Sequence, residues 1–118
     1  MKKKFAIIGA GIAGLTLANL VRKNSDHEFM LYEKQDSLSL EEGYGIQLST
    51  NSTKILNSIG FDKIDYKKIY HPKGLDFYNI QNKKICDLDL TQFNTDTNKY
   101  TTLQRSTLIE FLKDDIYT

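Results

Sequence analysis

The feature that most constrains this sequence is a glycine-rich turn close to its first residue. Three glycines at the spacing G-x-G-x-x-G run from Gly9 to Gly14 and directly follow the apolar segment 5–8. Such a segment is typical of a strand that is covered on both faces. The mostly apolar residues 15–24 predict a helix, and the apolar residues 29–32 predict a second strand. A strand, a helix and a strand within about thirty residues predict a βαβ unit with parallel strands.

Each glycine of this turn has its own physical role in binding a dinucleotide. Gly9 allows the tight turn after the strand, Gly11 lets the backbone approach a pyrophosphate, and Gly14 lets the helix pack against the strand. The helix N-terminus offers unpaired N–H groups and a partial positive charge to phosphates. Glu33 follows the second strand, where a carboxylate accepts hydrogen bonds from ribose hydroxyls and disfavours a 2′-phosphate. The unit therefore predicts a dinucleotide site, with NAD and FAD both open.

The next part of the chain predicts a loop and a short helix. Residues 34–42 are polar and lead into the glycine pair Gly43 and Gly45, so we expect a loop through this pair. A helix is expected after Ser49, with Gly60 as its C-terminal stop. The apolar residues expected on one face of this helix are Ile55, Leu56 and Ile59.

The last third of the chain predicts a hairpin, a strand and a helix. Two apolar runs around a polar turn make 75–90 an expected antiparallel hairpin. Residues 100–103 predict a further strand. The final helix is expected to start at Ser106 or Thr107, because Thr107 and Glu110 match a capping box.

Composition narrows the possible classes of protein. A length of 118 residues allows one small domain at most. The formal net charge of +1 gives no field that would attract nucleic acid or an anionic membrane. Cys86 is the single cysteine, which excludes an intrachain disulfide and a cysteine-based metal cluster. We therefore expect a cytoplasmic protein with no metal site and no nucleic-acid partner.

The N-terminus resembles a secretory signal in one respect. Lys2, Lys3 and Lys4 precede the apolar run 5–21, as the charged and apolar regions of a signal peptide do. The regularly spaced glycines and the polar residues inside this run count against that interpretation, and the run is shorter than the ~20 residues of a membrane-spanning helix. We expect neither a signal peptide nor a transmembrane segment.

Four segments together resemble the flavoprotein aromatic hydroxylases. That family includes salicylate and para-hydroxybenzoate hydroxylases, ubiquinone-pathway hydroxylases and tetracycline-inactivating monooxygenases. The segments are G-A-G-I-A-G-L-T-L-A from Gly9, Tyr32-Glu33-Lys34, G-Y-G-I-Q-L-S-T-N from Gly43, and L-Q-R-S-T-L from Leu103. They occur in the family's order over nearly the whole chain, and the resemblance implies FAD as the bound dinucleotide.

The resemblance also implies a set of FAD contacts. It places the pyrophosphate against the glycine turn, the adenosine ribose at Glu33, and the phosphate and ribityl region at Arg105. Lys34 stands where the family often has an arginine beside the adenosine, so the charge is kept but planar stacking is lost. Gln47 is expected in a loop near the flavin. The expected cofactor-binding residues are Gly9, Ala10, Gly11, Ile12, Ala13, Gly14, Glu33, Lys34, Gln47 and Arg105. No catalytic residue is identified.

The expected fold class is α/β, with a Rossmann-like βαβ FAD-binding unit and an inserted antiparallel β-hairpin, incomplete relative to the family. The chain is expected to be the N-terminal part of an FAD-binding monooxygenase domain. Its expected parts are 1–72 (the βαβ unit and the following helix), 73–104 (the hairpin and a strand) and 105–118 (a helix). The later Gly-Asp motif of the family is missing, so we expect a truncated product, a fragment or half of a split enzyme.

The resemblance implies a flavin monooxygenase, reduced by NADH or NADPH, that uses O₂ to hydroxylate a small aromatic substrate once a C-terminal part completes it. Two alternatives stay open. One is a standalone NAD- or nucleotide-binding module. The other is an inactive remnant or partner subunit that binds another chain through open sheet edges.

Overall fold

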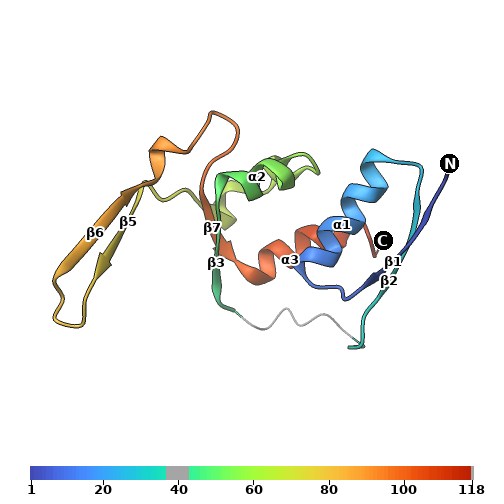
Figure 1. Ribbon diagram of the computed structural model, residues 1–118, viewed down its shortest axis with the longest axis horizontal. Coiled ribbons are helices and arrows are strands. Elements are labelled where there is room, and N and C mark those ends of the chain that lie inside the picture. The colour runs from blue at the N-terminus through green and yellow to red at the C-terminus, as the bar shows by residue number, and fades with distance from the viewer. Residues whose placement is uncertain (37–42, 118) are drawn as a thin grey trace.

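The molecule is elongated, with a βαβ unit at one end and a β-hairpin at the other (Figure 1). A computed structural model describes residues 1–36 and 43–117 of the chain. Its extents are 55 × 32 × 25 Å. In chain order the elements are β1 (Lys4–Ile8), α1 (Ile12–Asn24), β2 (Glu28–Tyr32), β3 (Gly45–Leu48), α2 (Thr50–Asn57), η1 (Phe61–Lys63), η2 (Tyr66–Lys68), β4 (Ile69–Tyr70), β5 (Gly74–Tyr78), β6 (Lys84–Asp89), η3 (Leu90–Gln92), β7 (Thr101–Gln104) and α3 (Arg105–Asp114), where η marks a 3₁₀ turn.

The N-terminal unit is the predicted βαβ crossover. β1 and β2 pair in parallel, with Phe5 opposite Phe29 and Ile7 opposite Leu31. The backbone N–H of Gly9 then donates to the carbonyl of Tyr32 at 2.7 Å, which ties the glycine turn to the end of β2. The α/β class, the parallel strands and the connecting helix are therefore confirmed.

Helix α1 lies unusually close to the turn that precedes it, and Gly14 makes this possible. A Cβ atom added at Gly14 would lie 1.9 Å from the carbonyl oxygen of Gly9 and 3.3 Å from the side chain of Ile7. Backbone atoms at that distance have no room to move aside. Gly14 therefore has the close-packing role that the sequence motif predicts.

A second sheet, in the order β3-β7-β4, is antiparallel and corrects the predicted loop through Gly45. Gly45 begins a strand instead, which pairs with β7 so that Ile46 faces Leu103 and Leu48 faces Thr101. Ile46 and Leu48 pack against the core, and the residue between them is exposed. This alternation is the period of a half-buried strand. It is too short to stand out from the flanking loop residues in the sequence.

Helix α2 follows directly and ends as predicted, although one of its expected core residues is exposed. Leu56 and Ile59 are buried, whereas Ile55 is 49% exposed and Thr53 takes the buried position on that face. Gly60 has a φ of +102°, the left-handed conformation that glycine adopts at helix ends.

The final helix starts earlier than predicted. α3 begins at Arg105, with Gln104 as its N-cap. Thr107 is therefore the third helical residue, and the predicted capping box with Glu110 is wrong. The inward face is as expected, since Leu108, Ile109 and Leu112 are buried.

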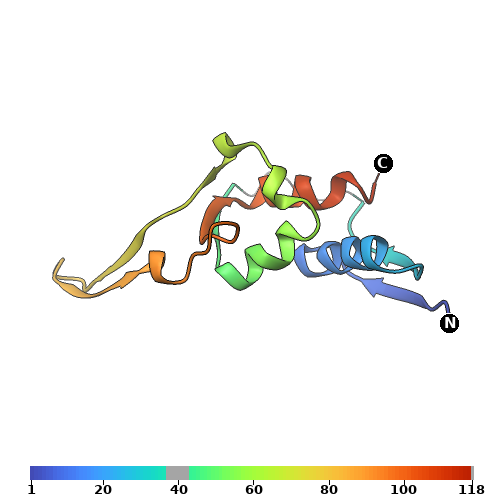
Figure 2. The same ribbon diagram turned by 90° about the horizontal axis from the view of Figure 1, so that it is seen from above.

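The predicted antiparallel hairpin is present as β5 and β6 and extends away from the rest of the molecule in both views (Figures 1 and 2). One face carries two facing apolar pairs, Leu75 with Leu88 and Phe77 with Cys86, and Cys86 is exposed. On the other face Asp76 lies opposite Asp87. The Lys84 ammonium contacts Asp87 at 3.0 Å and Asp76 at 3.3 Å, and these carboxylates raise the pKa of Lys84.

The hydrophobic core lies where α1, α2, α3 and β7 meet. Its buried members are Ala10, Leu15, Leu56, Ile59, Phe61, Leu103, Leu108, Ile109 and Leu112. The three-stranded sheet joins β4 and β7, which come from the predicted ranges 1–72 and 73–104, so these ranges share one folded body. Within the described residues, no helix has the length and apolar character needed to cross a membrane.

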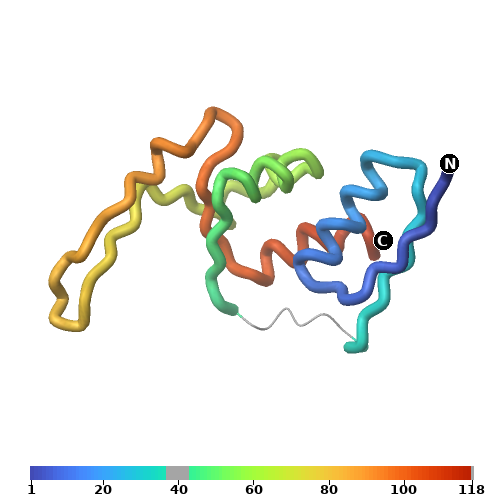
Figure 3. Tube along the Cα trace, viewed as in Figure 1, coloured from blue at the N-terminus to red at the C-terminus, as the bar shows by residue number. Residues whose placement is uncertain are grey.

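Helices α1 and α3 lie side by side, although they are far apart in the sequence (Figure 3). Asn19 is buried in α1, and its amide nitrogen donates to the carbonyls of Leu15 and Leu112, both at 2.8 Å. The carbonyl of Leu112 lies in the last turn of α3, where helical acceptors lose their usual partners. Nearby, the exposed Arg22 donates to the carbonyl of Asp115 at 2.9 Å and pairs with its carboxylate at 3.2 Å.

The close approach at Gly14 predicts that Gly14→Ala destabilises the protein. We expect the free energy of unfolding to fall by about 1–3 kcal/mol or more, because the added methyl meets a backbone carbonyl. The matched control is Gly11→Ala, since a Cβ at Gly11 meets no atom within 4 Å and its φ is −78°. Urea unfolding followed by circular dichroism measures both. Equal stabilities would contradict the packing role of Gly14.

The buried amide at the α1–α3 contact makes a second prediction. Asn19→Ala leaves the buried carbonyl of Leu112 without its side-chain donor, so we expect a loss of about 1–3 kcal/mol. Arg22→Ala at the same junction removes an exposed ion pair and should cost about 0–1 kcal/mol. The same urea experiment compares them, and a larger loss for Arg22→Ala would show that the exposed pair dominates this contact.

Candidate functional site

The glycine turn presents backbone donors at the start of α1. Gly9 has a φ of +96°, which turns the chain away from β1, and Gly11 is the N-cap of α1. The first helical hydrogen bond runs from the N–H of Leu15 to the carbonyl of Gly11. The N–H groups of Ile12 and Ala13 precede it, and no side chain caps this helix end. The first turn also carries no acidic residue, so its partial positive charge is not neutralised there.

The approach to these donors is open at Gly11. No heavy atom lies within 4 Å of the position that a Cβ would take there, in contrast to Gly14. Ala10 next to it is buried and belongs to the core, and Ala13 is exposed at the helix start. An anionic group can therefore approach the helix N-terminus over Gly11, where backbone N–H groups point toward it.

Glu33 is held directly beside the turn by two backbone donors. The N–H of Ala10 donates to one carboxylate oxygen at 2.7 Å, and the N–H of Gln35 donates to the other at 3.1 Å. These two hydrogen bonds, that of Ala10 first, hold the pKa of Glu33 below its ordinary value of 4.5. Each oxygen keeps a second lone pair for another donor. The carboxylate is thus ionised, oriented and able to accept further hydrogen bonds.

The other predicted cofactor residues lie on different elements. Lys34 follows Glu33 and is exposed. Gln47 lies in strand β3 rather than in the expected loop, because its neighbours pair with β7. Its side-chain oxygen accepts a hydrogen bond from the hydroxyl of Tyr100.

Arg105 is the first residue of α3, and Tyr44 holds it in two ways. The backbone N–H of Arg105 donates to the carbonyl of Tyr44 at 3.0 Å. Its guanidinium lies 5.7 Å from the centre of the Tyr44 ring, within the range of a cation–π contact. Arg105 therefore stands at a helix N-terminus, as the sequence predicts, with an aromatic side chain that orients its charge.

The structure thus forms two groups from the predicted residues. The glycine turn and Glu33 belong to the βαβ unit and are joined by hydrogen bonds. Gln47 and Arg105 belong to the β3-β7-β4 sheet and the helix that follows it. Sequence reasoning missed the partners of this second group, Tyr44 and Tyr100. The position of Tyr44 between Gly43 and Gly45 was a sequence signal that could have drawn attention to it. Tyr100 and Gln47 are far apart in the sequence, and no motif connects them.

No metal centre is found in this part of the molecule. Across residues 1–36 and 43–117, no group of three or more His, Cys, Asp or Glu side chains is arranged to hold a metal ion.

Comparison with known proteins extends this description. Residues 7–41 match the family model of an NAD(P)-binding Rossmann-like domain. The chain is 35% identical over 86 residues to an FAD-dependent monooxygenase of Penicillium roqueforti (strain FM164). This alignment covers 71% of this chain and 9% of that protein. It is 30% identical over 92 residues to an FAD-dependent monooxygenase of Metarhizium robertsii (strain ARSEF 23 / ATCC MYA-3075), covering 71% and 28%. It is 43% identical over 60 residues to 3-amino-4-hydroxybenzoate 2-monooxygenase of Streptomyces platensis, covering 50% and 14%.

Solved structures share the fold over almost the whole chain. 2-Methyl-3-hydroxypyridine-5-carboxylic acid oxygenase superposes with a TM-score of 0.75 at 23% identity, over 97% of this chain and 28% of that one. HpxO of Klebsiella pneumoniae, solved with FAD and uric acid, superposes with a TM-score of 0.73 at 19% identity, over 97% and 28%. The chain therefore spans less than a third of the length of these relatives.

The geometry around Glu33 predicts a pH dependence of stability. Because the pKa of Glu33 is lowered in the folded protein, its hydrogen bonds stabilise the fold fully above pH 4.5. This contribution is lost as the pH falls through the lowered pKa. Urea midpoints measured from neutral pH down to about pH 3 should fall more steeply for the wild type than for Glu33→Gln, which does not titrate. Parallel curves would contradict the proposed hydrogen bonding of the carboxylate.

Proposed function

We propose that this chain, which belongs to the flavoprotein aromatic hydroxylase family of FAD-dependent monooxygenases, supplies the part of an FAD site that holds the pyrophosphate and the adenosine ribose. The observation that carries this proposal is the open approach at Gly11 to an uncapped helix N-terminus. A pyrophosphate carries negative charge and several acceptor oxygens, which the unpaired N–H groups of the first helical turn complement. The turn fits such a group, because no atom fills the space over Gly11 and no side chain caps the helix end.

Glu33 is proposed to bind the adenosine ribose. Its carboxylate is fixed beside Ala10, next to the turn that is proposed to receive the pyrophosphate. A ribose hydroxyl would donate a hydrogen bond to a free lone pair of this oriented, ionised carboxylate. Lys34, exposed beside it, is proposed to add a positive charge near the adenosine.

Arg105 and Gln47 are proposed to contact the more distant part of FAD. A guanidinium can donate to several phosphate oxygens at once, and the contact with Tyr44 orients it at the start of α3. Gln47 is exposed on β3, and its side-chain oxygen is taken by Tyr100. The amide NH₂ of Gln47 has no hydrogen-bond partner within residues 1–36 and 43–117, so we propose that it donates to the cofactor.

The activity proposed for the whole protein is that of a monooxygenase. FAD, reduced by NADH or NADPH, would supply the oxygen chemistry with O₂, and a small aromatic compound would be the substrate. This chain would contribute placement of the cofactor. Because it spans less than a third of its relatives' length, we propose that further polypeptide contributes the rest of the flavin and substrate sites.

A second candidate, a standalone NAD- or nucleotide-binding module, shares the same adenosine and pyrophosphate contacts. The match of residues 7–41 to an NAD(P)-binding Rossmann-like domain is what supports it. The relatives that extend the similarity to 71% of the chain are FAD-dependent monooxygenases, so FAD is favoured.

Nucleotide titration tests the proposed site. We expect ADP and FAD to bind the wild-type chain in calorimetry, and Gly11→Val to weaken both by about tenfold or more, because its side chain occupies the approach of the pyrophosphate. Lys23→Val adds the same side chain at the other, exposed end of α1 and should leave both affinities unchanged.

Two results would decide against the proposal. If neither ADP nor FAD binds to folded wild-type protein, the turn is not a nucleotide site. If ADP and NADH bind but FAD does not, the second candidate is the correct one. Circular dichroism of Gly11→Val separates a blocked site from a misfolded protein.

A further inference from the structure

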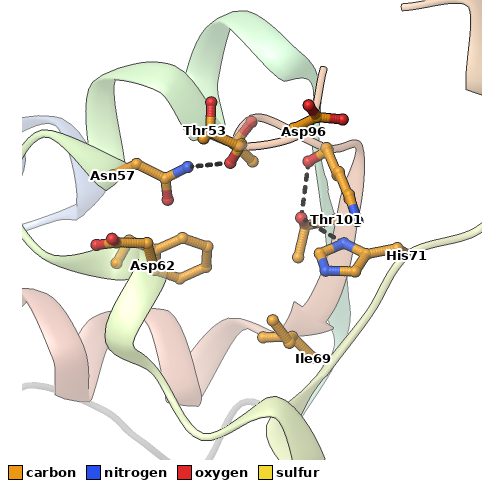
Figure 4. Close-up of a pocket in the computed structure, with 10 residues that line it drawn as sticks. Thr53, Asn57, Asp62, Ile69, His71, Asp96 and Thr101 are labelled. Carbon is orange, nitrogen blue, oxygen red and sulfur yellow. Dashed lines mark hydrogen bonds between the residues drawn. The ribbon is translucent and has the colours of Figure 1, made fainter. Parts of the chain in front are cut away.

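A separate cavity of about 360 Å³ lies beside the three-stranded sheet, under α2 (Figure 4). α2, η1, β4 and the segment that leads into β7 line it. None of its lining residues belongs to the glycine turn, and neither Glu33 nor Arg105 takes part. The cavity is therefore distinct from the proposed FAD contacts, and its ligand does not depend on them.

Asn57 presents a hydrogen-bond acceptor to this cavity. Its side-chain nitrogen donates to the carbonyl of Thr97 at 2.8 Å and to the side-chain oxygen of Asn98 at 3.1 Å. Both partners are oxygen acceptors, which fixes the orientation of the amide. Figure 4 shows the oxygen of Asn57 on the opposite side, directed into the cavity toward the region of Asp62.

His71 presents a second acceptor from the facing wall. Its Nδ1 lies 3.2 Å from the carbonyl of Tyr100 and 3.1 Å from the hydroxyl of Thr101. That hydroxyl donates to the carbonyl of Lys99 at 2.8 Å, so both neighbours of Nδ1 are acceptors. In the neutral imidazole the proton must then reside on Nδ1, and Nε2 is an acceptor. Figure 4 shows this second nitrogen on the cavity side of the ring, near Ile69.

The remaining walls are apolar and the rim is acidic. Phe61 is buried and Ile69 is half-buried, and both line the cavity. Asp62 and Asp96 stand at its rim, and neither forms an ion pair or hydrogen bond with any residue in 1–36 or 43–117. Lys99 is the one lining cation. Two carboxylates against one ammonium give the opening a net negative charge.

We propose that this cavity binds a small, flat organic cation that carries N–H donors, of the amidinium or guanidinium class. Such a ligand places its donors against the oxygen of Asn57 and Nε2 of His71, which come from opposite walls of the cavity. Its apolar body lies against Phe61 and Ile69, and the net negative charge of the rim, whose carboxylates are turned outward, favours its positive charge. An anion offers only hydrogen-bond acceptors to a site that already presents acceptors, and the negatively charged rim repels it. Both effects disfavour an anionic ligand.

Three isosteric probes separate shape from charge. Benzamidinium, benzamide and benzoate have nearly the same size, and they differ in being cationic, neutral and anionic. Titrated into ¹⁵N-labelled full chain and followed by amide chemical shifts, benzamidinium should shift the backbone signals of Asn57, His71 and Thr97. We expect it to bind about fivefold or more tightly than benzamide, and benzoate should give no saturable shifts.

Variants then assign the contacts. The double variant Asp62→Asn/Asp96→Asn keeps the side-chain shapes and should weaken benzamidinium by about fivefold. Its matched control, Asp36→Asn/Asp114→Asn, changes the same charge at exposed positions outside the cavity and should leave the affinity unchanged. His71→Leu should weaken benzamidinium and benzamide alike, because it removes an acceptor and no carboxylate.

The proposal is overturned if benzamidinium shifts no signals of the cavity residues or if benzoate binds as tightly. An equal loss of affinity in both double variants would overturn it as well, since the cation would then respond only to the overall charge. The amide spectrum of each variant shows directly whether it is folded. These outcomes are independent of whether the chain binds ADP or FAD.

Discussion

The arrangement of this molecule depends on the contact between Gly14 and the carbonyl of Gly9. Because no side chain separates them, α1 starts directly on the turn that ends β1. This contact fixes the direction of the helix axis, and therefore the place where the unpaired N–H groups of its first turn point. The space over Gly11, three residues before Gly14, stays open to solvent. The turn, the donors and the carboxylate of Glu33 are then held as one rigid unit by the hydrogen bond from Ala10.

The same helix also joins the two groups of proposed cofactor residues. Its buried face packs on α3, and Asn19 connects the two helices through the carbonyl of Leu112. Arg105 is the first residue of α3, so the position of this arginine relative to the glycine turn is set by the α1–α3 contact. A polar group buried at such a contact stabilises one alignment, because any shift along the helix axis would leave the carbonyl unpaired. The proposed FAD site thus depends on a packing interaction well away from its own residues.

The sequence predicted some elements well and others poorly, for identifiable reasons. The βαβ unit and the hairpin have strong local signals, namely the glycine spacing and two apolar runs around a polar turn. The sequence predicts a loop at strand β3, because the four residues of this strand gain their order from pairing with β7, more than fifty residues later. The capping box at Thr107 failed because the same pairing extends β7 to Gln104 and moves the helix start to Arg105. Ile55 is exposed because the α2 face that meets the core is set by tertiary packing.

By itself, the sequence determined the glycine turn, the order of the first strand, helix and strand, and the identity of the carboxylate beside them. These features follow from short-range steric and hydrogen-bonding rules that act within about thirty residues. Only the tertiary structure decided that Gln47 is a strand residue held by Tyr100, that Tyr44 orients Arg105, and that Asn57 and His71 line the same cavity. Those relations join residues whose separation in the chain carries no local signal. They exist because burial of the shared core brings α2, α3 and the three-stranded sheet together.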